Sequence, residues 1–317
     1  MATEDNYYFT FKDDAQHILK SIIAFSGFQS KLVIPEGVTE IGYEAFKKCN
    51  LIENVVLPEG VTEIPNRAFA QCKVLKTVKL PSALTTIGNF AFYNCETLEY
   101  IEIPEGVTEI GDDAFHNCKN LQNIIIPEGV TEISDCAFFG CHKLEKITLP
   151  ETLTNIGYKA FYNCYALKHI ELPDSITEID CKAFAHCRLL EQIEIPEGVT
   201  SIYGQTFAQC KALKNIIIPD GVTAIGRKAF ERCESLTSLE LPNSVTTIGE
   251  SVFDRCKKLV KITIPKDVTE INDYVFHNCN ALVSITIPES VTTIKEGAFA
   301  GCESLTSINL PENLTTI

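Results

Sequence analysis

The sequence is poor in several residue types and patterns that would assign it to a familiar functional class. It has no tryptophan, one methionine and only six histidines, which follow no common pattern. No run of 18 apolar residues occurs, so no segment is expected to span a membrane. The N-terminal stretch MATEDNYYFTFKDDAQHILK is acidic and lacks a basic region followed by an apolar core, so no signal peptide is expected.

Motifs of catalysis and cofactor binding are also missing. The sequence contains no GxGxxG, GxxxxGKS, HExxH or GxSxG motif. We therefore predict no catalytic residue, no cofactor and no metal ligand, and we expect that the protein is not an enzyme. The formal charge of -15, from 42 acidic and 27 basic residues, argues against nucleic acid and anionic lipid as partners.

What the sequence does contain is one pattern that recurs every 23 residues. Proline occurs thirteen times from Pro35 to Pro311, and the threonine of "VT" thirteen times from Thr39 to Thr315. A phenylalanine, usually within "AF", and a cysteine three residues later each occur twelve times at the same interval. A strict period of this length is typical of a solenoid, in which each repeat buries its apolar side against its neighbours.

Each repeat predicts the same local structure. In "LEYIEIPEGVTEIGDDAFHNC", residues 98–118, the alternating aliphatics predict a strand that the proline ends. The "VTEI" segment predicts a second short strand, and "DDAFHNC" predicts one helical turn. Stacked in register, the repeats give a mostly parallel β solenoid, and we expect it to curve with the "LxxIxI" sheet on the inner face.

The two ends depart from the pattern. Residues 1–30 are out of phase with the repeats and are predicted to form an N-terminal cap over the solenoid of about 12.5 repeats in residues 31–317. The sequence stops at Ile317 in the middle of a repeat, without a polar cap. We expect either that the natural chain is longer or that a partner covers this end, including a second copy through self-association.

The fourteen cysteines could indicate a disulfide scaffold, but twelve of them share one position in the repeat. Stacking would place these twelve in a column about 5 Å apart. We predict that most thiols are free and buried, because cysteine behaves as a small apolar residue. Zinc or redox chemistry would require CxxC pairs or convergent histidines, and no CxxC pair is present.

The pattern LxxIxIPxxVTxIGxxAFxxC resembles the BspA-like, or Treponema pallidum type, leucine-rich repeat. The likeness covers residues 31–317, and glycine or a small polar residue at positions such as Gly37 and Gly106 favours this type over other leucine-rich repeats. The resemblance implies a right-handed curved solenoid without catalytic residues. It further implies a protein on the surface of a cell that adheres to host proteins or to other cells.

Positions that differ between repeats are the candidate binding residues, because the repeated positions are committed to the core. On the outward side of the inner sheet these residues are mixed in charge with a few apolar points, which suits recognition of a protein. The alternative is a solvated sheet surface without a partner. The candidates on this sheet are Lys76, Lys79, Tyr100, Glu102, Ile125, Lys146, His169, Glu171 and Ile217.

A second candidate surface follows the residue after "AF". Four successive repeats place an aromatic residue there: Tyr93, His116, Phe139 and Tyr162. Such a stripe is typical of an interface, although the rings could instead brace one another. A column of carboxylates after the proline, from Glu36 to Glu312, could bind Ca²⁺ or a basic partner, or could be a solvated edge.

The sequence thus favours a non-catalytic protein-binding module at the cell surface or secreted, with adhesion or recognition as its role. An intracellular scaffold or delivered effector of the same fold is the alternative, and since no signal peptide is seen, a cytoplasmic location stays open. A metal-dependent or catalytic protein is the third and least favoured hypothesis.

Overall fold

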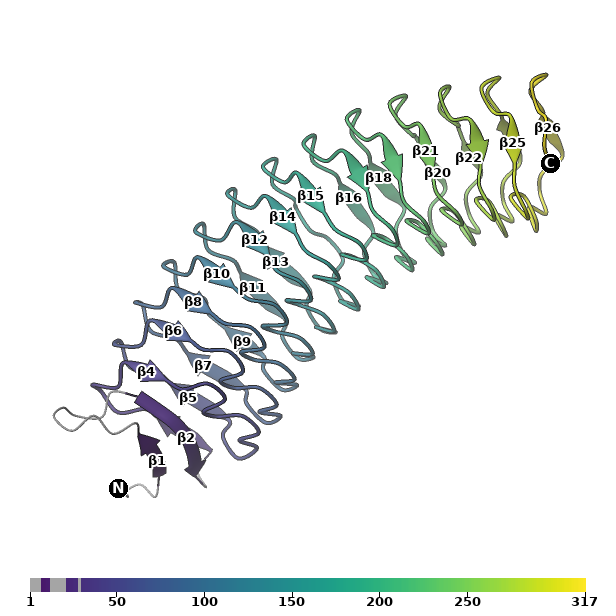
Figure 1. The fold of residues 1–317 in the computed structure, drawn as a ribbon. Coiled ribbons are helices and arrows are strands. Elements are labelled where there is room, and N and C mark those ends of the chain that lie inside the picture. The colour runs from purple at the N-terminus through teal and green to yellow at the C-terminus, as the bar shows by residue number, and fades with distance from the viewer. Residues whose placement is uncertain (1–6, 12–20, 28–29) are drawn as a thin grey trace. The chain divides into compact units, whose positions relative to one another are not determined.

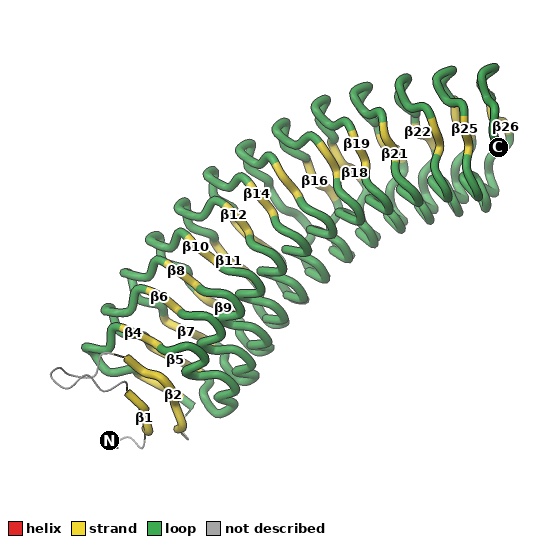
Figure 2. The backbone as a smooth tube through the Cα atoms, in the orientation of Figure 1, coloured by secondary structure: helices red, strands yellow, loops and turns green. Residues whose placement is uncertain are grey.

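The computed structural model describes residues 7–11, 21–27 and 30–317, and the chain forms two compact units, Met1–Leu153 and Thr154–Ile317. Each unit is a stack of repeats in which short strands alternate with turns (Figures 1 and 2). The described residues contain no helix, and hence none that could cross a membrane.

The unit Met1–Leu153 has two ladders of parallel strands. The first ladder uses the "LxxIxI" segments, and Leu32, Val55 and Val78 stand in register in its first three strands. Its strands β3 (Lys31–Val33), β5 (Asn54–Val56), β7 (Thr77–Lys79) and β9 (Tyr100–Ile101) form one sheet, and β11 (Asn123–Ile125) and β13 (Lys146–Thr148) form another. The second ladder uses the "VTxI" segments, of which β6 (Glu63–Ile64), β8 (Thr86–Ile87) and β10 (Glu109–Ile110) form one sheet. The segments before and after it are β4 (Glu40–Ile41) and β12 (Glu132–Ile133).

The unit Thr154–Ile317 repeats this arrangement. Its "LxxIxI" strands are β16 (Gln192–Glu194), β18 (Asn215–Ile217), β20 (Ser238–Leu239), β22 (Lys261–Ile262), β24 (Ser284–Thr286) and β26 (Ser307–Asn309). Its "VTxI" strands are β14 (Asn155–Ile156), β15 (Glu178–Ile179), β17 (Ser201–Ile202), β19 (Ala224–Ile225), β21 (Thr247–Ile248), β23 (Glu270–Ile271) and β25 (Thr293–Ile294). In both units the predicted solenoid of parallel strands is confirmed, whereas the predicted curvature of the whole chain stays a prediction.

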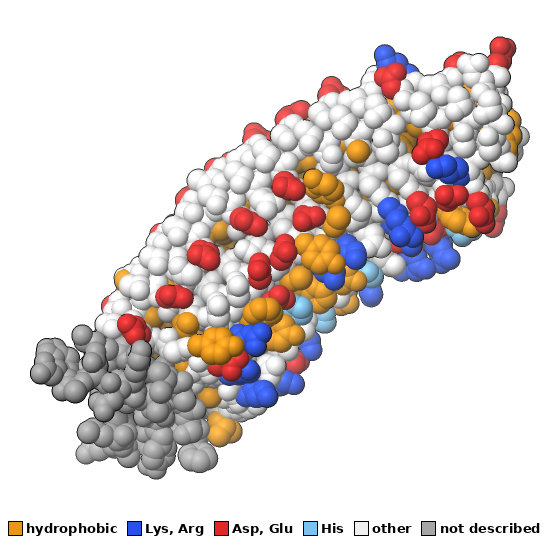
Figure 3. Space-filling view, in the orientation of Figure 1, with side chains coloured by type: hydrophobic (Ala, Val, Ile, Leu, Met, Phe, Trp, Pro, Cys, Tyr) orange, Lys and Arg blue, Asp and Glu red, His pale blue; other side chains and the backbone are white. Residues whose placement is uncertain are grey.

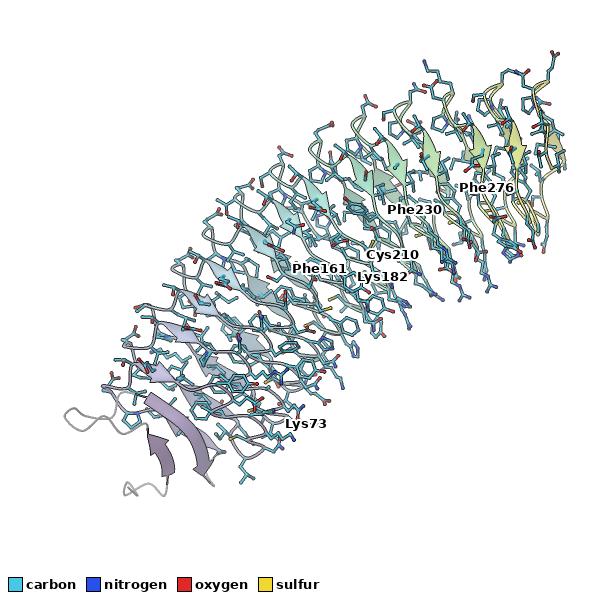
Figure 4. The ribbon with its side chains drawn as sticks, viewed as in Figure 1. Lys73, Phe161, Lys182, Cys210, Phe230 and Phe276 are labelled. Carbon is cyan, nitrogen blue, oxygen red and sulfur yellow. The ribbon has the colours of Figure 1, made fainter. Side chains whose placement is uncertain are left out.

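The core of each unit is built from columns of identical residues 23 positions apart. The phenylalanine rings of "AF" stack face to face, with centroids 4.9–5.5 Å apart in the first unit and 5.3–5.7 Å apart in the second. Phe161, Phe230 and Phe276 mark this column in Figure 4. Eleven of the twelve phenylalanines, Phe46 to Phe276, are fully buried, so the strict repetition of "AF" is a packing requirement.

The cysteine column lies beside the phenylalanine column. Ten of its members, from Cys72 to Cys279, are buried, and no cysteine of the chain forms a disulfide. Most of these thiols donate to the carbonyl oxygen of the phenylalanine 26 residues earlier, over 2.9–3.3 Å. The predicted burial is confirmed, and each of these cysteines also links its repeat to the preceding one.

The predicted helical turn is wrong, because the segment is a chain of β-turns. In Gly42–Cys49, three N–H groups donate to carbonyl groups three residues earlier at 3.0–3.1 Å, as in successive turns. Glu44 and Lys48 have φ of 58° and 62°, a left-handed conformation that interrupts any helix.

The same segment forms a third ladder between repeats. The N–H of Phe46 donates to the carbonyl of Ala68 in the next repeat at 2.8 Å. The N–H groups of Glu44 and Lys48 donate to the carbonyls of Asn66 and Ala70 of that repeat at 3.4 and 2.9 Å. A helical turn would use these N–H groups internally. The spacing of "AFxxC" suits either structure, and the bonds between repeats favour the turns.

Two strands precede the repeats. β1 (Tyr7–Phe11) and β2 (Ser21–Gly27) form an antiparallel pair, and β2 runs parallel to β4 with Ile22 opposite Ile41. The remainder of residues 1–30, apart from Ser30, lies outside the described residues. The N-terminal cap stays a prediction, which the pairing of β2 with β4 supports.

Candidate functional site

The outward side chains of the "LxxIxI" ladder, with those of the loops that follow it, form a surface that we call the strand face. In the unit Met1–Leu153 this face is hollowed by a groove of about 820 Å³. Three columns line it: Lys31, Asn54, Thr77 and Tyr100; Val56, Lys79 and Glu102; and Glu59, Ser82 and Glu105. Its floor includes Val55 and Val78, which belong to the core.

The unit Thr154–Ile317 has a groove of about 390 Å³ at the same positions of its repeats. The three columns there are His169, Gln192 and Asn215; Glu171, Glu194 and Ile217; and Asp174 and Glu197. This groove contains four carboxylates and no lysine or arginine, whereas the first groove contains both signs. The two grooves therefore differ in charge although residues at the same positions of the repeat line both of them.

Six of the sequence-predicted residues line the grooves. Lys79, Tyr100 and Glu102 lie in the first groove, and His169, Glu171 and Ile217 lie in the second. The other three residues predicted on this sheet, Lys76, Ile125 and Lys146, are exposed on the strand face but line neither groove.

Some polar groups of the strand face are already occupied within the chain. The ammonium group of Lys76 lies 2.9 Å from the carboxylate of Glu53, one repeat earlier. The exposed apolar side chains have no such partner: Tyr100 is 55% exposed, Ile125 65% and Ile217 58%. They are the strongest candidates for contact with another molecule, since exposed apolar groups gain most from being covered.

The carboxylate column after the proline has a structural role in places. The carboxylate of Glu59 accepts hydrogen bonds from the N–H and the hydroxyl of Ser82 in the next repeat, at 2.7 and 2.8 Å. These bonds hold the pKa of Glu59 below its ordinary value. Glu128 likewise accepts the N–H of Glu151 at 3.2 Å, so such carboxylates cap the backbone of the following repeat.

Ser82 is also a groove residue, and sequence reasoning did not single it out as a binding residue. The signal for it was the break in the carboxylate column, where serine replaces the usual glutamate. Among the residues that the structure describes, no group of three or more histidine, cysteine or acidic side chains could hold a metal ion.

The predicted aromatic stripe lies on the edge of the repeats that carries the β-turns, which we call the turn edge. In the first unit, His116 stands between Tyr93 and Phe139, with ring centroids 4.8 and 4.4 Å away. Its Nδ1 lies 2.5 Å from the carboxylate of Asp113. All three rings are half-buried, which fits mutual bracing as well as an interface.

Tyr162, the fourth member of the stripe, belongs to the second unit. Its ring centroid lies 4.9 Å from that of His186 in the next repeat, and Lys159 Nζ lies 5.7 Å from the ring. In Figure 3, orange, blue and pale-blue side chains gather along the lower edge of the view, where Figure 4 places Lys73 and Lys182 of the turn edge.

These features define a leucine-rich-repeat solenoid whose exposed strand face carries non-repeated residues. The chain matches the BspA type leucine rich repeat region, with six copies, over residues 16–142, 108–237 and 223–317. The chain therefore belongs to the BspA type leucine-rich repeat family, as its repeat pattern predicted.

Solved structures with this fold come from several bacteria. A leucine-rich repeat protein of Bacteroides ovatus is 30% identical and has a TM-score of 0.88, over 99% of this chain and 89% of that one. A leucine rich cell surface protein of Faecalibacterium prausnitzii is 32% identical with a TM-score of 0.64, over 96% and 93% of the two chains. A search of curated proteins found no match.

Proposed function

We propose that the protein is a non-catalytic module that binds another protein through the strand face. The observation that carries the proposal is the exposure of Tyr100 beside a groove of about 820 Å³ with both signs of charge. An aromatic anchor in a polar surround is the usual composition of a protein-recognition surface. The membership of a leucine-rich repeat family supports this proposal, since such repeats generally bind proteins.

The chemistry of the strand face also supports binding over catalysis. Catalysis requires unlike groups that converge on one point with altered pKa values. The repeats instead place each groove side chain in a column with its counterparts, and the lowered pKa of Glu59 follows from a structural hydrogen bond. We therefore propose no catalytic role.

We further propose display at a cell surface or secretion, with adhesion as the role. The support is the resemblance to the cell surface protein of Faecalibacterium prausnitzii. The alternative, an intracellular scaffold or effector, is compatible with the absence of disulfides. Since ten thiols of the column are buried, they would stay reduced in either compartment. Surface biotinylation of intact source cells separates the two hypotheses.

The binding proposal is tested with the double variant Tyr100→Ser, Ile125→Ser. Partners are first captured from secreted and surface proteins, and their affinities are measured by biolayer interferometry. Truncating two such anchors is expected to weaken binding by about 2 kcal/mol or more, and to leave the melting temperature unchanged because both side chains are exposed. Tyr43→Ser is the control, since Tyr43 is exposed but lies in the first β-turn of its repeat, outside the strand face. Equal losses in both variants would contradict the proposal.

Self-association through the last repeat is a separate proposal. Leu310 and Ile317 are exposed there, whereas their counterparts one repeat earlier, Ile287 and Ile294, are buried. Exposed apolar side chains of this kind favour burial against a second copy. Sedimentation velocity should show a dimer for the wild type and a monomer for Leu310→Glu. A wild-type protein that is monomeric at all concentrations would reject the proposed self-association.

A further inference from the structure

The turn edge of the unit Thr154–Ile317 has an uneven distribution of charge. Over three successive repeats, at 158–166, 181–189 and 204–212, it contains four cations and no aspartate or glutamate. In the next two repeats, lysine and arginine alternate with carboxylates and pair with them, as in Arg227 with Glu250 at 3.1 Å. Of the four cations, Lys211 pairs with Glu234 of the next repeat, whereas Lys182 and Arg188 form no ion pair with a carboxylate of the described residues.

Tyrosine rings hold the cations of these repeats in place. Lys182 Nζ lies 5.7 Å from the centroid of Tyr158, and the guanidinium of Arg188 lies 4.6 Å from that of Tyr165. Lys159 Nζ lies 4.8 Å from the centroid of Tyr158. A ring attracts a cation but accepts no strong hydrogen bond, so Lys182 and Arg188 keep N–H donors for an anion. Figure 4 shows Lys182 on this edge.

His186 lies within the same cluster, against Tyr162. Its Nδ1 is buried and has no hydrogen-bond partner. Burial lowers the pKa of His186, and the charges of Arg188, Lys211 and Arg232 lower it further. The imidazole is thus uncharged near neutral pH in a positive local field, which a bound anion would reduce.

Lys211, the fourth cation, contributes less to the positive charge of this edge. Lys211 Nζ lies 3.2 Å from the carboxylate of Glu234, one repeat later, so its charge is partly compensated. On the other side, the carboxylate of Asp180 accepts the N–H of Cys181. Lys182 and Arg188 are therefore the two cations of the cluster that keep N–H donors for an anion, and Arg188 is the first of the charges that lower the pKa of His186.

We propose that Tyr158, Tyr162, Tyr165, Lys182, His186 and Arg188 form a docking surface for an acidic peptide segment of a partner protein. The proposal rests on the proposed protein-binding function and adds a second surface to it. Charged guanidinium and ammonium groups bind carboxylates through charge-assisted hydrogen bonds, and the tyrosine rings cover the apolar parts of a peptide.

A peptide fits this surface better than a nucleic acid does. The six residues come from two successive repeats, whose phenylalanine rings lie 5.3 Å apart, so the cluster spans one such step and offers only a few cations. Nucleic-acid binding usually neutralises about 6–10 phosphates, and the net charge of -15 repels a long polyanion. Two or three carboxylates on one extended segment match the size and charge of the cluster.

The test uses the full chain and a fluorescein-labelled, end-capped hexaglutamate peptide, with affinity measured by fluorescence anisotropy at low salt. The double variant Lys182→Gln, Arg188→Gln is expected to weaken binding by about tenfold or more. Arg227→Gln, Lys257→Gln is the matched control, because it also removes one arginine and one lysine from the same edge, but from residues that carboxylates already neutralise. We expect this control to change the affinity by less than about twofold.

Equal weakening in both double variants would show a response to net charge only and would overturn the proposal, as would absence of wild-type binding. Tighter binding of a six-nucleotide oligothymidine than of the peptide would overturn it in favour of nucleic acid. NMR titration of His186 gives an independent readout: hexaglutamate should raise its pKa in the wild type and not in Lys182→Gln, Arg188→Gln.

The two surfaces are tested separately. Tyr100→Ser, Ile125→Ser alters the strand face of the other unit and should leave hexaglutamate binding unchanged. Loss of partner binding in that variant, together with failure of the peptide to bind, would retain the proposed function and reject the docking surface alone.

Discussion

The thiol of Cys118 donates a hydrogen bond to the carbonyl oxygen of Phe92, 26 residues earlier, at 3.3 Å. The same oxygen accepts the N–H of Cys95 at 3.1 Å, so one carbonyl joins a turn to the following repeat. Both side chains are fully buried. Cysteine suits this position because it is small, apolar and able to donate one weak hydrogen bond.

Replacing Cys118 by alanine should therefore destabilise the protein. The variant loses the bond to Phe92 and leaves a small cavity, and we expect the free energy of unfolding to fall by about 1–3 kcal/mol. Urea denaturation followed by circular dichroism measures the change. Cys181→Ala is the control, because Cys181 lies outside the column and is half-buried, and its effect should stay within about 0.5 kcal/mol. Equal effects would show that the column has no special role.

The buried thiols also predict a loss of stability in alkali. Burial raises the pKa of Cys118 well above its ordinary value, and the neighbouring Cys141 adds to the rise. Below the pKa of the unfolded chain both states are protonated, so the full contribution is present. Above it only the unfolded state ionises, and the contribution is lost by about 1.4 kcal/mol per pH unit until the raised folded value is reached.

The stability difference between the wild type and Cys118→Ala isolates this effect from other titrating groups. It should shrink by about 1 kcal/mol or more between about pH 9 and pH 10, since the alanine variant has no thiol to ionise at this position. Denaturation curves at the two pH values measure it. A difference that is constant with pH would mean that the thiol of Cys118 ionises as readily in the folded protein as in the unfolded chain.

The left-handed residues of the β-turns give a prediction that separates turns from a helix. Lys48 is exposed and has φ of 62°. Glycine adopts this conformation without steric cost, so Lys48→Gly should be more stable than Lys48→Ala by about 1 kcal/mol. In a helical turn the alanine variant would instead be the more stable one, also by about 1 kcal/mol. Thermal denaturation of the two variants decides between the structures.

The aromatic stripe of the first unit is predicted to contribute to stability. His116 is only 16% exposed and contacts Tyr93, Phe139 and Asp113. Removing its ring in His116→Ala should lower the free energy of unfolding by about 1–2 kcal/mol. His169→Ala serves as the control, because the His169 side chain is 50% exposed on the strand face. If both variants keep wild-type stability, the stripe is free to act as an interface alone.

The repeat pattern predicted the columns of the core but not every backbone conformation. Phe46 and Leu32 recur because each must contact its own counterpart in the next repeat, so their spacing shows directly which residues stack. The conformation at Glu44 and Lys48 could not be derived in this way. Neither residue is a glycine, and only the bonds between repeats make the left-handed conformation favourable.

The candidate site was predictable only in part. Variation between repeats pointed to Tyr100 and Ile217, and both are exposed in the structure. The grooves depend on how far neighbouring side chains such as Lys79 and Glu105 rise above the strands, which a one-dimensional pattern does not give. The cluster around Arg188 depends on side chains from different repeats, and its sequence signal is the absence of carboxylates from three consecutive turn edges.

The central claim is that the repeated residues build the fold and the non-repeated residues of the strand face bind a partner. Photocrosslinking tests it most directly, with benzoylphenylalanine in place of Tyr100 or Ile217 on the strand face, and in place of Tyr43 within the β-turns. All three side chains are exposed, so access to solvent does not distinguish them. We predict that one and the same partner crosslinks from position 100 or position 217 and not from position 43. Crosslinks to the same partner from all three positions, or from position 43 alone, would contradict the account.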